Sequence, residues 1–252
     1  CSDTEAALIE ELPHQIENSV KHCLDHALNQ GHKVGAFLSG GTDSSTVVGM
    51  LKKLTGEARA FAIGFEEPGY NELGYARLAA NHFDAELNEY MVTPQDLLEA
   101  IELIAEVYDE PFGNSSVIPT YYCAKLAKEN GIDTLLAGDG GDEIFGGNER
   151  YAGDKVFANY DRIPLFLRNK LIEPIVQALP QVHPIVKKSK KFIRRANIPL
   201  PDRFYSYCPV MSLGQEKIFS ADFLDELSEY DPSAWARELY KQAQAVDDLD
   251  RL

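Results

Sequence analysis

The sequence predicts an α/β protein with a doubly wound parallel sheet and an appended helical lobe. Short apolar runs alternate with amphipathic helical patterns over the first 150 residues, which is typical of a parallel sheet. Glycine-rich loops directly follow two of these runs. Beyond Gly147 the strand patterns vanish, prolines recur and the apolar spacing becomes helical. We therefore expect an α/β domain over residues 1–150 and a helical lobe over 151–252.

The first predicted elements are a helix, a buried strand and a second helix. Apolar residues recur at helical spacing over 4–30, and Gly31 then provides a terminal glycine. The short apolar run 33–38 predicts a buried strand. The small-residue loop 39–43 leads from this strand into a helix over 44–54.

The following elements continue the alternation, and each helix is long enough to connect parallel strands. The predicted elements are strands over 59–65, 86–92 and 132–137, and helices over 71–83, 95–108 and 118–130. The last of these strands leads into a second glycine-rich loop, 138–143.

The composition is that of a globular protein with a sizeable core. Apolar residues make up 44% of the 252 residues and charged residues 25%, which excludes a disordered chain, a collagen-like fibre and a coiled coil. The formal net charge of −16 argues against a nucleic-acid coat or a membrane-surface protein. A basic segment, 151–200, departs from this balance, and we expect it to face solvent, an acidic partner or an anionic substrate rather than nucleic acid.

The sequence also indicates the compartment. The four cysteines (Cys1, Cys23, Cys123 and Cys208) show neither a CxxC pair nor metal-ligand spacing, so no disulfide framework or zinc module is predicted. No apolar run approaches the roughly 18 residues that span a bilayer. The N-terminus is acidic and lacks the basic start of a signal peptide. We expect a cytoplasmic protein without a membrane partner.

The first glycine-rich loop, Ser39–Ser45, predicts a phosphate site. Ligands of open parallel sheets bind outside the carboxyl ends of the strands, where this loop lies. Its backbone amides and the start of the next helix can hold a phosphate or pyrophosphate, and serine hydroxyls add donors. Asp43 within such an anion site suggests that Mg²⁺ joins the acid to the phosphates. The loop matches neither a Walker A nor a Rossmann sequence, and a plain surface turn is the alternative interpretation.

The second loop is a candidate metal site. It holds Asp139, Asp142 and Glu143 within five residues, and three carboxylates this close repel one another unless a cation or donor compensates. Oxygen ligands alone suit Mg²⁺ best. The DxDxDG spacing of a calcium loop is absent.

Three segments together resemble a known family. Leu38–Ser45 (LSGGTDSS) looks like the pyrophosphate loop of the N-type ATP pyrophosphatases. With Asp109–Ser116 (DEPFGNSS) and Ala137–Gly147 (AGDGGDEIFGG) it resembles the synthetase domain of the asparagine synthetase family. The likeness is close over roughly residues 5–160. It implies a Rossmann-like ATP pyrophosphatase fold of the adenine nucleotide α-hydrolase type.

The resemblance also implies a role for each matching residue. The candidate catalytic residues are Asp43, Asp139 and Asp142; Asp43 and Asp142 would hold Mg²⁺, and Asp139 would lie near the reacting amino acid. The β- and γ-phosphates would bind to the first loop, at Ser39, Gly40, Gly41, Asp43, Ser44 and Ser45. Adenine and ribose would contact Leu38, Ile63, Gly64 and Phe65, and the backbone would approach the nucleotide at Gly138, Gly140 and Gly141.

The implied reaction uses ATP and Mg²⁺. A substrate carboxylate, aspartate in the parent family, is adenylated with release of pyrophosphate, and ammonia or an amine then attacks the acyl-adenylate. The family takes its ammonia from a glutaminase domain, which we do not expect within this chain. A lysine-containing segment of the family would follow the last residue, so we expect the lobe to be truncated at its C-terminal end and the fragment to turn over poorly.

Several functions remain open at this point. The second loop begins Ala137-Gly138-Asp139, where asparagine-specific members often have Ser-Gly-Glu. The alternatives are a related enzyme that adenylates another carboxylate for β-lactam formation or peptide modification, and a non-catalytic nucleotide-binding module. A third alternative, a nucleic-acid-modifying pyrophosphatase, would use the basic segment.

Overall fold

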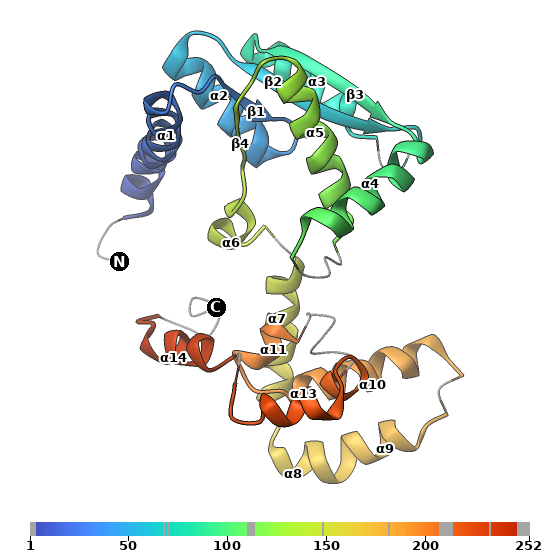
Figure 1. Cartoon of the computed structure of the whole chain (residues 1–252). Coiled ribbons are helices and arrows are strands. Elements are labelled where there is room, and N and C mark those ends of the chain that lie inside the picture. Colours follow the sequence, from blue (N-terminus) through green and yellow to red (C-terminus); the bar gives the residue numbers. More distant parts are fainter. Residues whose placement is uncertain are drawn as a thin grey trace. The chain divides into compact units, whose positions relative to one another are not determined.

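The chain divides into two compact units, Cys1–Ile144 and Phe145–Leu252. The computed structural model describes residues 4–67, 69, 71–109, 114–147, 149–180, 182–206, 214–231 and 233–245 (Figure 1). The division falls a few residues before the boundary expected near Tyr151. Among the described residues, no helix is long and apolar enough to cross a membrane.

The first unit is built on a parallel sheet with the order β3-β2-β1-β4. Its strands are β1 (Val34–Phe37), β2 (Arg59–Phe65), β3 (Glu86–Val92) and β4 (Thr134–Leu136). In the register of the central strand, Ala36 lies opposite Ala60 on one side and Leu136 on the other. The predicted α/β class and parallel sheet are thereby confirmed.

Helices cover both faces of this sheet. Their bounds are α1 (Glu5–Asn29), α2 (Thr42–Thr55), α3 (Leu73–Phe83), α4 (Pro94–Val107) and α5 (Val117–Glu129). Because successive side chains of a strand point to opposite faces, Ala36 and Leu38 pack with α1, α2 and α3, whereas Phe37 packs against Cys123 and its neighbours on α5. Figure 1 shows these helices arranged around the sheet.

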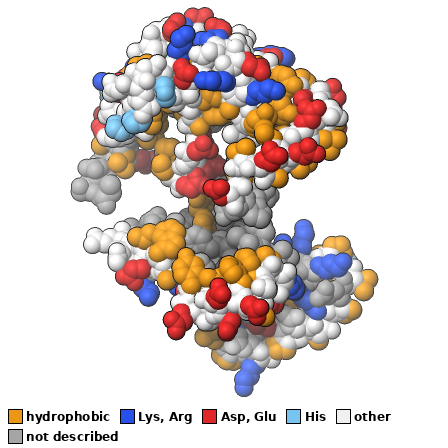
Figure 2. Space-filling model, in the orientation of Figure 1, with side chains coloured by type: hydrophobic (Ala, Val, Ile, Leu, Met, Phe, Trp, Pro, Cys, Tyr) orange, Lys and Arg blue, Asp and Glu red, His pale blue; other side chains and the backbone are white. Residues whose placement is uncertain are grey.

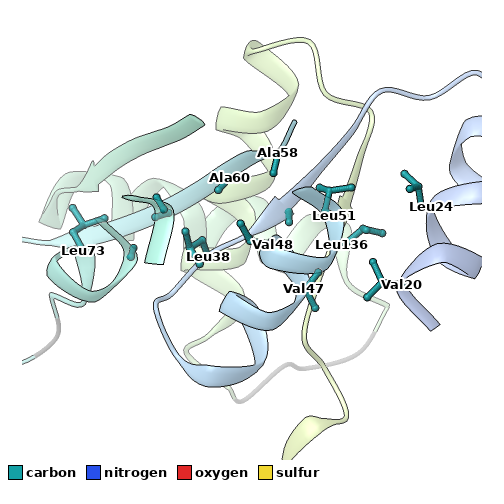
Figure 3. Packing of buried hydrophobic residues seen from close by; sticks show 14 residues of the cluster. Val20, Leu24, Leu38, Val47, Val48, Leu51, Ala58, Ala60, Leu73 and Leu136 are labelled. Atoms are coloured by element: carbon teal, nitrogen blue, oxygen red, sulfur yellow. The ribbon is translucent and has the colours of Figure 1, made fainter. Parts of the chain in front are cut away.

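The larger core cluster lies under α1, α2 and α3. Figure 3 shows Val20 and Leu24 of α1 beside Val47 and Leu51 of α2, with Leu136 close to them. Small strand residues, Ala36, Ala60 and Ala62, allow the helices to approach the sheet closely. On the other face Phe61 is fully buried, which stabilises the fold by about 1.5–3 kcal/mol.

The connections create a switch point in the middle of the sheet. The chain runs outward from β1 through β2 to β3, and α4 and α5 then return it to form β4 on the opposite side of β1. The strand order therefore reverses between β1 and β4. In open α/β sheets, ligands bind at such a point, outside the carboxyl ends of the strands.

The second unit is helical wherever the structure describes it, as predicted. Its elements are α7 (Glu149–Asp161), α8 (Leu165–Leu167), η1 (Arg168–Ile172), α9 (Glu173–Ala178), α10 (Pro184–Ala196), α11 (Asp202–Tyr205), η2 (Gln215–Lys217), α13 (Ala221–Glu226) and α14 (Ala234–Gln242). Phe157 and Tyr160 of α7 pack against Ile193 and Ala196 of α10. The outer face of α10 exposes its lysines, including Lys187, Lys188 and Lys191, which fits the interpretation of a solvated basic face.

Candidate functional site

Both glycine-rich loops lie at the switch point, one after β1 and one after β4. Since Ala36 pairs with Leu136, the two strands end side by side and their loops leave the sheet together. The second loop is shorter than expected because its last residues form a short helix, α6 (Gly141–Phe145). The prediction of an irregular loop over the whole of 138–143 was therefore wrong.

Serine hydroxyls hold the first loop in shape. The Ser39 backbone N–H donates to Ser44 Oγ at 3.2 Å, and the Gly41 N–H donates to Ser39 Oγ at 3.2 Å. The Ser44 hydroxyl in turn donates to the Gly41 carbonyl at 3.3 Å. These bonds join the end of β1 to the first turn of α2, so the loop is organised before any ligand binds.

The N-terminus of α2 is open to an anion. Gly41 precedes its first turn, and no side chain among the described residues forms a capping hydrogen bond there. The first amides of a helix have no partner within the helix and carry the positive end of its dipole. This geometry supports the predicted phosphate site.

Gly40 allows a close approach that no other residue permits. Its φ is +87°, in the left-handed region, and a Cβ there would lie 2.4 Å from the Tyr75 carbonyl carbon and 2.5 Å from the Ala76 nitrogen. The loop therefore packs directly on the first turn of α3, backbone against backbone.

Two glycines of the second loop pack on Asp43 of the first. A Cβ on Gly138 would lie 2.8 Å from Asp43 Cβ and 3.0 Å from the Ser44 nitrogen. A Cβ on Gly141 would lie 2.6 Å from Asp43 Oδ2. The absence of side chains at both positions is what lets the two loops meet.

The carboxylates of the site are accessible. Asp139, Asp142 and Glu143 are exposed and Asp43 is half-buried. Figure 2 shows acidic side chains gathered over α6. No group of three or more His, Cys, Asp and Glu side chains that could hold a metal occurs in the described part of the chain. Two carboxylates completed by phosphate oxygens and water are nevertheless a usual Mg²⁺ environment, so the donor types of Asp43 and Asp142 fit this ion.

Two adjoining cavities open at the switch point. One, of about 320 Å³, is the more polar of the two, and the site residues on its wall are Ser39, Gly41, Asp43, Ser44, Gly138 and Asp139. The other, of about 250 Å³, is more apolar, and its wall includes Leu38, Phe61, Ile63, Phe65, Leu73 and Cys123. Phe37, Ser39 and Thr120 line both cavities, which therefore meet at these residues.

Most of the predicted site residues border these cavities, but several do not. Gly64 packs against Leu73, so that a Cβ there would lie 2.4 Å from Leu73 Cδ1. The other predicted residues away from both walls are Gly40, Ser45, Gly140, Gly141 and Asp142. Gly40 and Gly141 instead set the packing of the loops.

Sequence reasoning missed Phe37, Thr120 and Cys123 on the walls. No local motif marks them. Thr120 and Cys123 lie on α5, which reaches the site only through its packing on the sheet, and Phe37 faces this helix from β1. Of the segment 109–116, Glu110–Gly113 lie outside the described residues. Asn114 Oδ1 accepts a hydrogen bond from the Ser116 N–H at 3.0 Å, next to the start of α5.

Comparisons with known proteins identify the family of the chain. The family model described as asparagine synthase matches residues 15–206. The glutamine-hydrolyzing asparagine synthetase 1 of Bacillus subtilis (strain 168) is 26% identical over 248 residues, which cover 96% of this chain and 37% of the relative. A Methanocaldococcus jannaschii relative with an asparagine synthetase name is 35% identical over 178 residues, or 69% of this chain and 33% of the relative.

A third relative, the glutamine-hydrolyzing asparagine synthetase B of Escherichia coli (strain K12), is 32% identical over 154 residues. These cover 54% of this chain and 26% of the relative. The chain thus spans about a third of the length of the curated relatives it matches. The matched residues, 15–206, include both glycine-rich loops and the switch point.

Proposed function

Because the chain belongs to the asparagine synthase family, we propose that it is the ATP-using synthetase unit of an amide-forming ligase. One observation carries the proposal, namely that a cavity with hydroxyls and carboxylates at a helix N-terminus adjoins a more apolar cavity at the same sheet edge. A nucleoside triphosphate combines a polyanionic chain with a flat apolar base. The two cavities match these two parts in chemistry.

In the proposed reaction, a carboxylate oxygen of the substrate attacks the α-phosphorus of ATP. The bond between that phosphorus and the oxygen bridging to the β-phosphorus breaks, and pyrophosphate leaves. Ammonia then attacks the acyl carbon, the bond to the AMP oxygen breaks, and the nitrogen loses a proton. This chemistry needs alignment and charge stabilisation from the protein rather than a protein nucleophile.

The phosphate chain is assigned to the first loop. The open amides at the start of α2, with the hydroxyls of Ser39, Ser44 and Ser45, would bind the β- and γ-phosphates. When bound, Mg²⁺ would neutralise the charge that pyrophosphate carries away. Asp43 and Asp142 would hold that ion. The half-buried position of Asp43 between the two loops supports this role.

The base and the acceptor are assigned to the neighbouring walls. Leu38, Ile63 and Phe65 border the apolar cavity, which supports adenine there, with Gly64 shaping the strand end. Gly138, Gly140 and Gly141 would keep the backbone close to the nucleotide. Asp139, on the wall of the polar cavity, would face the amino group of the substrate.

We propose aspartate as that substrate and ammonia as the nucleophile, supplied by a glutaminase domain. The names of the relatives from Bacillus subtilis and Escherichia coli, both glutamine-hydrolyzing asparagine synthetases, support these assignments.

Calorimetry with α,β-methylene-ATP tests nucleotide binding separately from turnover. The chain should bind this analogue more tightly with Mg²⁺ than without it. Asp43→Asn and Asp142→Asn should each weaken the Mg²⁺-dependent affinity about tenfold, because each removes a charged ligand. Asp25→Asn is the matched control, since Asp25 is an exposed carboxylate on α1. Equal affinity in all four proteins would refute the metal assignment, and absence of binding would refute the nucleotide site.

The substrate requires a second assay. Exchange of labelled pyrophosphate into ATP should depend on aspartate when the chain is assayed within its full-length protein. Exchange that depends on a different carboxylic acid would instead identify an enzyme for another substrate. Nucleotide binding without any exchange would favour the non-catalytic module.

A further inference from the structure

The helical unit contains a cavity of its own, with a volume of about 620 Å³. It is bordered by the C-terminal end of α7, by α8, η1 and the first residue of α9, and by the segment that follows α10. All of these belong to Phe145–Leu252. The volume is typical of small-molecule sites, and the nucleotide chemistry proposed above makes no use of this cavity.

Two buried arginines form one side of the cavity. The side chains of Arg168 and Arg203 are only 8% and 5% exposed. They share one carboxylate, because Arg168 Nη1 donates to Asp161 Oδ1 at 2.6 Å and Arg203 Nη1 donates to Asp161 Oδ2 at 3.2 Å. Arg168 Nη2 also donates to Asn197 Oδ1 at 3.4 Å, whereas the buried Nε of each arginine has no hydrogen-bond partner in the described part of the chain. Buried cations are normally paired more completely than this.

The nearest further carboxylate compensates these arginines poorly. Asp154 Oδ1 lies 3.7 Å from Arg203 Nε, too far for a hydrogen bond, and Asp154 Oδ2 has no partner within the described residues. Burial raises the pKa of Asp154, although Arg203 and Arg195 oppose the shift, so its charged form is disfavoured. Two guanidinium groups on this wall thus share a single hydrogen-bonded carboxylate within the described residues, which favours a further anionic group beside them.

The cavity wall also carries negative charge. Glu173 borders the cavity and is held by two hydrogen bonds, from Tyr160 OH to Oε1 at 3.1 Å and from Asn197 Nδ2 to Oε2 at 3.0 Å. With Asp161 also on the wall, a ligand carrying only negative charge would be repelled. Five apolar residues complete the lining, namely Leu165, Ala196, Ile198, Pro199 and Leu200.

We propose that this cavity binds a free α-amino acid, with its carboxylate on Arg168 and Arg203 and its ammonium group beside Glu173. The apolar residues would receive the side chain of the ligand. Cations, a carboxylate and an apolar wall on one cavity are what such a zwitterion requires. The inference concerns a different unit from the nucleotide site and does not depend on the proposed function.

Calorimetry on the chain with single amino acids tests the proposal, with leucine, glycine, aspartate and glutamine as probes. Inorganic phosphate and AMP serve as probes without an α-amino acid group. We expect leucine to bind about tenfold or more tightly than glycine, because its side chain would be buried against the apolar wall. Any affinity of the chain for phosphate or AMP belongs to the proposed nucleotide site and should be the same in the wall variants described next.

Variants of the cavity wall that keep both buried arginines locate the binding. Glu173→Gln removes the partner of the ammonium group, and Asn169→Asp adds a repelling carboxylate to an exposed position on the wall. Each should weaken leucine binding about tenfold. Asn159→Asp makes the same chemical change as Asn169→Asp at an exposed position of α7 away from the cavity and should leave the affinity unchanged.

Three results would overturn the proposal. These are no binding of leucine at millimolar concentration, leucine binding no tighter than glycine binding, and leucine binding that both wall variants leave unchanged. Binding of α,β-methylene-ATP by the same variants reports separately on the nucleotide site, so the two proposals fail independently.

Discussion

Gly141 lies against the carboxylate of Asp43, so closely that a Cβ on Gly141 would stand 2.6 Å from both Asp43 Cγ and Oδ2. The two residues come from different loops, almost a hundred positions apart in the chain. Any side chain at position 141 must therefore displace the carboxylate that we assign to the metal.

The first prediction is that Gly141→Ala impairs nucleotide binding more than it impairs folding. The atoms in the way belong to the end of a side chain, which can rotate aside at a modest cost in stability. We expect the Mg²⁺-dependent affinity for α,β-methylene-ATP to fall about tenfold, as for loss of the Asp43 ligand itself. Calorimetry and thermal unfolding of the same sample measure both effects.

Gly74→Ala is the control for this variant. Gly74 lies in α3, and a Cβ there would meet no atom within 4 Å. Alanine is the better helix former, by up to about 1 kcal/mol. We expect this control to keep full nucleotide affinity, with equal or higher stability. If Gly141→Ala also kept full nucleotide affinity, the present position of the Asp43 carboxylate would not be needed for nucleotide binding.

The second prediction contrasts two glycines with similar backbone conformation. Gly40 and Gly140 have φ values of +87° and +90°, but a Cβ meets the Tyr75 and Ala76 backbone only at Gly40. At Gly140 no atom lies within 4 Å. Gly140→Ala should cost about 1 kcal/mol in the free energy of unfolding, from backbone strain alone. Gly40→Ala should cost about 2 kcal/mol more, because backbone must move.

Urea unfolding of the two variants measures this difference. Equal losses in the free energy of unfolding would mean that the first loop can move away from α3 at no cost in stability. Since Tyr75 and Ala76 lie in the first turn of α3, a large loss of stability at Gly40 would show that the first loop depends on this helix for its position.

The regular elements of the α/β unit could be predicted because their apolar runs are bounded by polar or glycine residues. The strands at 59–65 and 86–92 have the predicted bounds. The last strand was predicted over 132–137 but extends only over Thr134–Leu136, the residues that pair with Val34–Ala36 of β1.

The site was predictable where its residues stand in the two loops or at the end of β2, which the family resemblance marks. Thr120 lines both cavities, yet it lies on an ordinary helix and reaches the site through the packing of α5 on β2 and β3. Similarly, Arg168 belongs to a segment whose charges suggest a solvated surface, but it is buried over the Tyr160 ring, 4.7 Å from the centroid. Contacts between distant segments decide both positions, and no local pattern encodes them.

The third prediction concerns stability at acidic pH. The pKa of Asp96 lies below its ordinary value of 3.8, chiefly because the Thr93 backbone N–H and hydroxyl each donate to Asp96 Oδ2 at 2.8 Å. A carboxylate whose pKa is lowered by folding stabilises the folded state above its unfolded pKa. This contribution is lost as the pH falls through the lower, folded value.

Asp96→Asn should therefore destabilise the protein at neutral pH, and it should lose less further stability between pH 5 and about pH 2 than the parent does. Urea midpoints at several pH values measure this. Asp25→Asn, at an exposed position of α1, should follow the parent. A parallel shift of Asp96→Asn at every pH would show that the hydrogen bonds from Thr93 stabilise the fold without the charge of the carboxylate.

The fourth prediction concerns the two cysteines whose surroundings the structure describes. Cys23 is exposed, whereas Cys123 is 3% exposed, and its thiol donates to the Phe61 carbonyl at 3.4 Å. Burial raises the pKa of Cys123 to about 12, so almost none of it is thiolate at neutral pH. Brief treatment with iodoacetamide at pH 8 should label Cys23 and leave Cys123 unmodified, as peptide mass spectrometry can measure.

Nucleotide binding should extend this protection, because Cys123 also lines the apolar cavity assigned to adenine. In urea concentrations that allow slow labelling of Cys123, α,β-methylene-ATP with Mg²⁺ should slow the labelling further. The rate at Cys23, on α1 and away from the cavity, should stay the same and so serves as an internal control. Because Cys23 is exposed in the folded state, equal slowing at both thiols would indicate only an effect on the reagent. Slowing at Cys123 alone would support nucleotide binding, because binding stabilises the folded state that buries this thiol, and its absence would contradict a base in that cavity.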